Sequence, residues 1–217
     1  ISPLIRHYIY VNAITGEVIN IEPRIKTVNA NAATRYSGTR TISTELNGST
    51  YRLRDYDNSR GDGIGTYNLN NSTSYSSATD FTDADNNWTS GEYDNAAKDN
   101  GALDAHWGAI MTYDYFQNIH GRDSYDDAGA AIESYVHYST NYENAFWNGS
   151  VMTYGEGNTN FDILTSIDVA AHEIGHAVCT HTANLAYRNE SGAINEALSD
   201  IWGLVLKNMR QTIKIHG

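Results

Sequence analysis

Two short apolar-rich runs near the beginning of the chain have the pattern of a β-hairpin. The first run occupies residues 8–11 and the second residues 18–21, and the segment between them contains Gly16. A glycine in a short connection indicates a turn, because glycine adopts the backbone angles that a tight hairpin requires. We therefore predict two paired strands over residues 7–22.

The next part of the chain predicts a linker followed by a β-rich region. Residues 29–37 are small and polar and follow no hydrophobic period, as expected of an exposed linker that a protease can reach. From residue 38 to residue 77, short runs rich in threonine, tyrosine and asparagine favour strands, with 51–53 and 64–67 as examples. We place a boundary in the linker.

Helical periodicity marks three later segments. Apolar and aromatic positions recur at spacings of three and four over residues 103–119, which predicts an amphipathic helix. Further helices are predicted over residues 168–178 and from residue 192 or 193 to residue 206. Residues 144–154, which lie between these helices, are predicted to form strand, turn and strand.

These elements predict an α+β fold in four parts. Residues 1–30 contain the hairpin and the start of the linker, and residues 31–167 form a β-rich lobe with one amphipathic helix. Residues 168–206 form a pair of helices. Residues 207–217 form a tail that continues neither helix pattern.

Composition excludes several classes of function. The 217 residues are 40% hydrophobic, which is enough for one domain or two small ones. The formal net charge of −12 repels phosphate groups and anionic lipids, so we expect neither nucleic acid nor a membrane as a partner. We expect a soluble monomer. Cys179 is the one cysteine, and we interpret it as a small buried hydrophobic residue.

The sequence HEIGH at residues 172–176 is the strongest chemical signal. Its two histidines are four residues apart, so on a helix they lie one turn apart on one face and can converge on one ion. Glu173 points to the side of this pair, where a carboxylate can take a proton from a metal-bound water. That position suits a general base better than a metal ligand.

A catalytic zinc ion needs a third protein ligand and one open position. Glu196, within the third predicted helix, is our candidate; Glu190 is the alternative, although Ser191 and Gly192 after it indicate a helix start. Asp200 lies one turn beyond Glu196, and we expect it to accept the N–H of a ligand histidine. The other histidines near these helices are predicted to be packing or surface residues: His106, His120 and His181.

Two blocks of this sequence resemble the thermolysin-like neutral proteases. They run over residues 168–178 and 187–200, and the resemblance extends back through 144–149 and 154–157 and more loosely to about Gly38. It implies a secreted zinc metalloendopeptidase, made as a zymogen, that hydrolyses peptide bonds of proteins. The zinc would be held by His172, His176 and Glu196, and Glu173 would activate the zinc-bound water.

The resemblance also implies roles for residues around the zinc site. Tyr187 would help to stabilise the oxyanion of the tetrahedral intermediate, and Asn144 with the main chain of Ala145 would bind the substrate backbone. Phe161 and Val169 would line the pocket for the residue after the scissile bond, which would favour large apolar side chains there.

Structural calcium is a further implication of the resemblance. Asp168 resembles a calcium ligand, and Asp83, Asp85 and Asn87 resemble an acidic calcium loop of the family. Their alternating oxygen atoms suit a hard cation. A solvated turn without an ion is an equally good interpretation of these three residues.

Both ends of the chain differ from the catalytic unit of that family. The hairpin over residues 7–22 resembles the last strands of a propeptide, so we expect residues 1–30 to end a pro-segment that is cleaved within residues 29–37. The helical C-terminal lobe is absent and residues 207–217 look unlike the family, which indicates a truncated or frameshifted chain. The alternative function is therefore a catalytically silent fragment that binds metal or peptide.

Overall fold

A mixed sheet lies at the centre of the protein and carries the strands nearest to the histidines. The computed structural model describes residues 7–23, 27–56 and 59–213. Strand order in this sheet is β12-β13-β11-β7-β6, with β8 paired to β7. The strands are β6 (Arg54–Asp55), β7 (Ile64–Asn68), β8 (Thr79–Asp80), β11 (Ile132–Tyr138), β12 (Ala145–Trp147) and β13 (Met152–Gly155). Strands β7, β11 and β13 run parallel, and β12 forms an antiparallel edge.

A second sheet contains the segment that the sequence predicted to be a linker. Its order is β10-β3-β4-β5-β9. The strands are β3 (Thr27–Thr34), β4 (Gly38–Asn47), β5 (Thr50–Arg52), β9 (Thr82–Asp83) and β10 (Asn87–Trp88). The linker prediction over residues 29–37 is wrong, because Ala30 and Ala32 alternate with more exposed neighbours and face the core. An alternation of alanine and asparagine carries little hydropathy contrast, so its period is easily overlooked.

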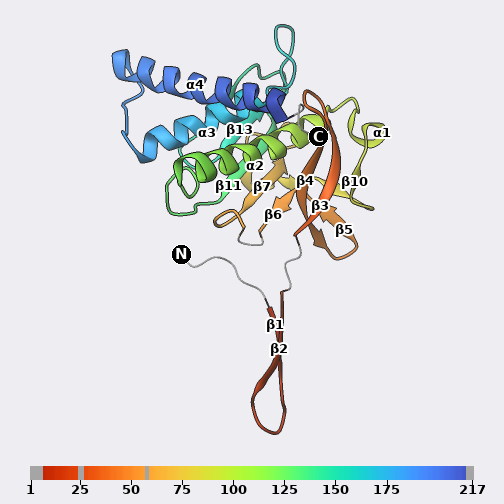
Figure 1. Ribbon diagram of the computed structural model, residues 1–217. Coiled ribbons are helices and arrows are strands. Elements are labelled where there is room, and N and C mark those ends of the chain that lie inside the picture. Colours follow the sequence, from red (N-terminus) through yellow and green to blue (C-terminus); the bar gives the residue numbers. More distant parts are fainter. Residues whose placement is uncertain (1–6, 24–26, 57–58, 214–217) are drawn as a thin grey trace.

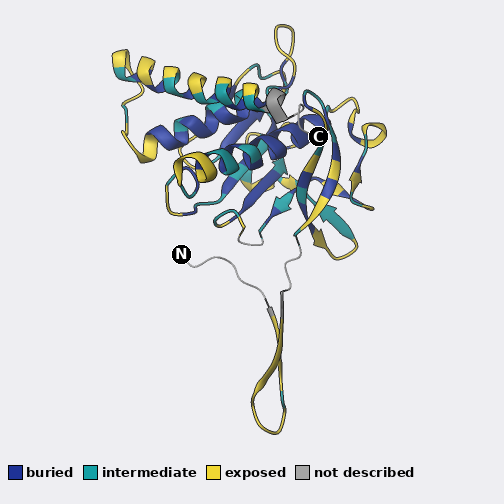
Figure 2. Cartoon of the chain, in the orientation of Figure 1, coloured by how far each residue is buried: buried dark blue, intermediate teal, exposed yellow. Residues whose placement is uncertain are grey.

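The central helix α2 (Asn100–His120) enters the core and contacts strands of both sheets. Residues 100–110 are all buried, so the helix is enclosed over its first three turns rather than lying on the surface as an amphipathic element (Figure 2). A short 3-10 turn (Tyr75–Ser77) and a four-residue helix α1 (Ser90–Tyr93) complete this part of the chain. The predicted helix over residues 103–119 therefore exists, but buried and more exposed positions alternate only after Ile110.

Helices α3 (Ile167–His181) and α4 (Asn189–Ile213) pack against each other beside the central sheet (Figure 1). Cys179 is buried on α3, as predicted. Helix α4 begins before the predicted start at residue 192 and continues beyond residue 206, so much of the predicted tail is helical. A side-chain carbon added at Gly175 would lie 2.9 Å from the Trp202 ring, and one at Gly203 would lie 2.6 Å from the Asp168 carbonyl oxygen. Glycine at these two positions lets the helices approach closely.

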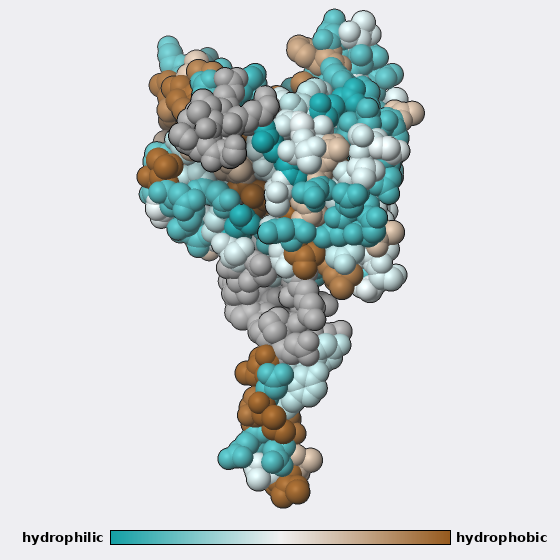
Figure 3. Space-filling view, turned by 45° about the vertical axis from the view of Figure 1, so that its right-hand side comes forward, coloured by the Kyte–Doolittle hydropathy of each residue, from teal (hydrophilic) through white to brown (hydrophobic). Residues whose placement is uncertain are grey.

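The predicted N-terminal hairpin exists as strands β1 (His7–Val11) and β2 (Val18–Pro23), which pair in antiparallel fashion. It projects away from the body of the protein (Figure 1). Its apolar side chains are exposed, and Figure 3 shows them as hydrophobic patches along the projection. Among the described helices, none combines the length and the hydropathy that a membrane span requires.

Candidate metal centre

Helix α3 places His172 and His176 on one face. Their rings are 4.5 Å apart between centroids and nearly perpendicular, with an interplanar angle of 87°. This follows from the spacing of four residues, which is close to one helical turn. The opposite face of the helix is buried against the core through Ala170, Ala171 and Ile174, which fixes the direction of both imidazoles.

Helix α4 adds Glu196 to the two histidines. One carboxylate oxygen lies 3.2 Å from His172 Nε2, and the other lies 3.7 Å from His176 Nε2. Two ligand atoms at about 2.1 Å from a tetrahedral ion are about 3.4 Å apart, so these separations fit a zinc ion. Within the described residues, this is the one group of three histidine, cysteine or acidic side chains whose ligand atoms converge, all within 4.8 Å of each other. Glu190, the alternative ligand, is exposed at the start of α4.

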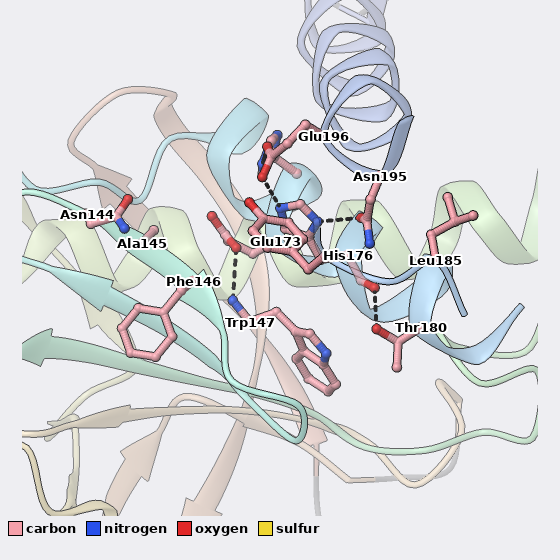
Figure 4. Close-up of a pocket in the computed structure, with 12 residues that line it drawn as sticks. Asn144, Ala145, Phe146, Trp147, Glu173, His176, Thr180, Leu185, Asn195 and Glu196 are labelled. Carbon is pink, nitrogen blue, oxygen red and sulfur yellow. Dashed lines mark hydrogen bonds and ion pairs between the residues drawn. The ribbon is translucent and has the colours of Figure 1, made fainter. Parts of the chain in front are cut away.

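Side chains of α4 lie within hydrogen-bond distance of Nδ1 of both histidines. His172 Nδ1 lies 2.9 Å from Oδ1 of Asp200, the residue that the sequence analysis paired with a ligand histidine. His176 Nδ1 lies 2.7 Å from Asn195 Oδ1 (Figure 4). It also lies 3.2 Å from Ser199 Oγ. With Nδ1 as the donor, each Nε2 is left with its lone pair toward Glu196, which is the tautomer that a metal ligand needs.

Glu173 is placed beside these groups but is oriented differently. Its side chain is buried, the residue being 5% exposed, and Oε2 accepts a hydrogen bond of 3.0 Å from the Trp147 main-chain N–H of β12 (Figure 4). Burial raises the pKa of Glu173 to about 8; the Trp147 N–H opposes this rise and the charge of Glu196 adds to it. Sequence reasoning missed Asn195, Ser199 and the Trp147 N–H, although Asn195 and Ser199 flank Glu196 on one helix.

A cavity of about 440 Å³ opens over these groups. Asn144, Ala145 and Tyr187 line it together with both histidines, Glu173 and Glu196. The Tyr187 ring lies 5.8 Å from that of His176, and the residue is 69% exposed. The structure thus brings together the residues that the sequence grouped as catalytic and backbone-binding.

The two residues predicted to share an apolar pocket lie in different cavities. Val169 lines an adjoining cavity of about 480 Å³ with Asn144, His172 and Glu173. Phe161 is exposed and lines another, of about 460 Å³, on the far side of Leu164. Phe161 is separated because the main chain of residues 160 and 161 is hydrogen-bonded to the Glu143 carboxylate.

None of the predicted calcium ligands Asp83, Asp85 and Asp168 belongs to a convergent group of three histidine, cysteine or acidic side chains in the described part of the chain. Asp83 is buried, and its Oδ1 accepts main-chain hydrogen bonds from residues 85, 86 and 87, while Oδ2 accepts one from the Tyr93 hydroxyl. Asp85 is exposed and accepts the N–H of Asn87. Asp168 accepts a hydrogen bond of 2.5 Å from Lys207 Nζ. Each carboxylate is therefore engaged by a protein donor.

Two family models match this chain. Residues 29–180 match the model of the thermolysin metallopeptidase catalytic domain, and residues 183–216 match that of its α-helical domain. The second match includes residues 207–216, which the sequence analysis had set apart from the family. The catalytic-domain match begins within β3.

Individual proteins similar to this chain include a bacillolysin and a thermolysin. The chain is 47% identical over 201 residues to bacillolysin of Brevibacillus brevis, covering 92% of this chain and 36% of that protein. It is 49% identical over 153 residues to thermolysin of Alicyclobacillus acidocaldarius, covering 70% of this chain and 27% of that protein. It thus spans about a third of the length of these relatives.

A solved structure is also similar. The precursor of protealysin, a metalloproteinase of Serratia proteamaculans, aligns with a TM-score of 0.58 and 31% identity, over 69% of this chain and 44% of that one. This supports the α+β fold, with β strands preceding the helix pair. The two convergent histidines, the adjacent carboxylates and the matches over both domains lead to one conclusion: the chain belongs to the thermolysin family of metallopeptidases.

Proposed function

We propose that this protein is the zinc-binding part of a secreted endopeptidase that hydrolyses peptide bonds of proteins. The observation that carries this proposal is the convergence of His172, His176 and Glu196, with Glu173 beside them at the floor of one cavity. Bound there, zinc would act as a Lewis acid on the peptide carbonyl and would lower the pKa of a water molecule. Three protein ligands leave a fourth position for these groups.

Glu173 is the proposed general base. Its carboxylate would take the proton of the attacking water and pass it to the leaving nitrogen. The Trp147 N–H fixes one oxygen of Glu173, so the other oxygen is the one that would face the water. Burial favours the neutral form of this carboxyl, and the positive charge of a bound ion would favour the ionised form.

Strand β12 is the proposed binding edge for the substrate backbone. It ends the strand order of the central sheet, so one side has no partner strand within the described residues. The Trp147 N–H points away from β13 toward Glu173, and Ala145, two residues earlier, faces the same way. An extended peptide could therefore pair with the main chain of Ala145, with the Asn144 side chain beside it.

Four further roles belong to this proposal. Tyr187, exposed at the rim of the cavity, would donate to the oxyanion. Val169 would contact a large apolar side chain after the scissile bond in the adjoining cavity. Calcium remains a proposed structural ion, with Asp83 and Asp85 as candidate ligands, and the hairpin β1–β2 is proposed to end a propeptide.

A silent metal-binding fragment is the second candidate. It is favoured by the exposure of Tyr187 and Leu204, which line the two adjoining cavities at the site and leave them open to water. An open site weakens the electrostatic stabilisation that a peptidase requires.

One experiment separates the two candidates. The 217-residue chain is loaded with zinc, its zinc content is measured, and casein hydrolysis is followed with and without 1,10-phenanthroline. One bound zinc with hydrolysis that the chelator abolishes supports the peptidase. One bound zinc without turnover supports the silent fragment, and a folded chain that takes up no zinc contradicts both.

A further inference from the structure

An ion pair joins the beginning of helix α3 to helix α4 at a carboxylate that the family resemblance assigned to calcium. Lys207 Nζ lies 2.5 Å from Asp168 Oδ2, and the two side chains are 49% and 31% exposed. Asp168 is in the first turn of α3, where the free N–H groups of a helix favour a negative charge. The lysine is therefore the nearest positive charge to this carboxylate within the described residues.

The position of Lys207 follows from the way the helices cross. Gly203 lies so close to the first turn of α3 that an added side-chain carbon would be 2.6 Å from the Asp168 carbonyl oxygen. Lys207 is four residues further along α4 and thus on the same face, one turn beyond this contact. The Lys207 side chain can therefore reach the Asp168 carboxylate, and the close contact between the helices keeps these two groups next to each other.

The donor set at this position does not fit calcium. Calcium takes six to eight oxygen ligands, most of them carboxylate or carbonyl oxygens. Two other carboxylates line the same cavity, Asp200 and Glu173. Asp200 Oδ1 is engaged by His172 Nδ1, and Glu173 Oε2 accepts the Trp147 main-chain N–H. An ammonium group cannot act as a ligand, and at this distance from Asp168 it would repel a dication.

We infer that the ammonium group of Lys207 takes the place of calcium at Asp168, so that this carboxylate contributes to helix pairing and not to ion binding. Lys207 then supplies the positive charge that a bound calcium ion would otherwise supply. Calcium dependence of the protein, where present, arises at other residues. This inference does not depend on peptidase activity.

The test compares calcium binding by the unmodified chain and by Asp168→Asn, which keeps the shape of the side chain. Calcium stoichiometry is measured by titration calorimetry and the calcium-induced shift in Tm by circular dichroism. We expect both values to be the same in the two proteins, including the case in which neither binds calcium. A smaller stoichiometry or a smaller Tm shift in Asp168→Asn would overturn the inference. Asp85→Asn serves as the matched control at the other candidate site.

Two substitutions at Lys207 test the charge itself. In calcium-free buffer, Lys207→Met should lower Tm by about 2 °C, as expected for one partly exposed ion pair in a domain of this size. Lys207→Arg should retain most of the Tm, and 1 M salt should reduce the difference between the Met and Arg variants. Equal Tm values for the unmodified, Met and Arg proteins would contradict the role of the ammonium group.

Discussion

Two groups of histidines in this protein differ in the partners of their ring nitrogens. His106 on α2 is 0% exposed, with Nε2 at 2.8 Å from the Ser43 carbonyl oxygen and Nδ1 at 3.0 Å from the Thr66 hydroxyl. In His172 and His176 on α3, Nδ1 is hydrogen-bonded to a side chain of α4. Nε2 of each ring faces Glu196 and a cavity. A histidine is thus available to a metal when one nitrogen is fixed and the other remains accessible.

The largest expected effect separates catalysis from metal binding. Glu173→Gln should lower the turnover of the active enzyme by about 10²- to 10⁴-fold, because the amide cannot accept the proton of the water. Zinc content should stay unchanged, since Glu173 is not among the three convergent ligands. Steady-state peptide hydrolysis and elemental analysis measure the two quantities. Turnover within twofold of the unmodified enzyme would remove Glu173 from the mechanism.

A second substitution tests the buried histidine. His106→Ala should lower the free energy of unfolding by about 3 kcal/mol, because it leaves a cavity and removes the partner of the Thr66 hydroxyl and the Ser43 carbonyl. Urea titration measures this loss. The folded fraction of the variant should still bind zinc with the stoichiometry of the unmodified chain. A loss of zinc from folded protein would show that the two histidine groups are not independent.

A smaller effect is expected behind the metal site. Asn195→Ala should weaken zinc binding by about 10- to 100-fold, because His176 loses the acceptor that holds its Nδ1–H at 2.7 Å. Competition with a chromophoric chelator gives the affinity. Ser199→Ala is the matched control: the longer contact of 3.2 Å predicts a weaker effect. The opposite order of the two variants would assign the orientation of His176 to Ser199.

The smallest effect is a change of stability with pH. Burial lowers the pKa of His106 from 6.5 to about 4, so the unfolded state binds a proton first and stability falls as the pH drops from 6.5 toward 4. Burial raises the pKa of Asp104 from 3.8 to about 6, although its hydrogen bonds, including that from the Tyr36 N–H, oppose the rise. The stability that neutral Asp104 contributes is present below pH 3.8 and is lost as the pH rises through 6.

These opposite signs largely cancel in the unmodified chain. Between pH 7 and pH 5, we expect these two groups together to lower the stability by less than about 1 kcal/mol. Asp104→Asn should remove the opposing contribution, so that the loss from His106 alone over the same range is about 2 kcal/mol and the variant loses more stability than the unmodified chain. Urea titrations at the two pH values provide the measurement. An equal loss in both proteins would mean that Asp104 does not titrate in this range.

Local spacing predicted the parts of the site that lie on one helix. The interval from His172 to His176 is sufficient to place two imidazoles on one face, and Glu196 and Asp200 are related by the same rule on α4. The Trp147 N–H could not be predicted, because it depends on which side of β12 faces α3. Phe161 was grouped with Val169 by resemblance alone, and the hydrogen bonds from its loop to Glu143 keep it elsewhere.

The fold was predictable where side chains differ strongly in hydropathy. The hairpin, the paired strands after residue 144 and the three long helices follow from such contrasts. Strand β3 was missed because its buried positions are alanines, and the character of α2 was missed because buried polar residues such as Asp104 and His106 interrupt its pattern. Hydrogen bonds that satisfy buried polar groups are tertiary, so a local pattern does not reveal them.

The close contact between α3 and α4 at Gly175 and Gly203 also determines the rotation of one helix against the other. A slip of α4 by one residue would turn Glu196 by about 100° about the helix axis and move it by about 1.5 Å. Such a slip would bring a side chain larger than glycine against the Asp168 carbonyl. Gly175 and Gly203 thus determine the position of the Glu196 carboxylate through helix packing, without contacting it.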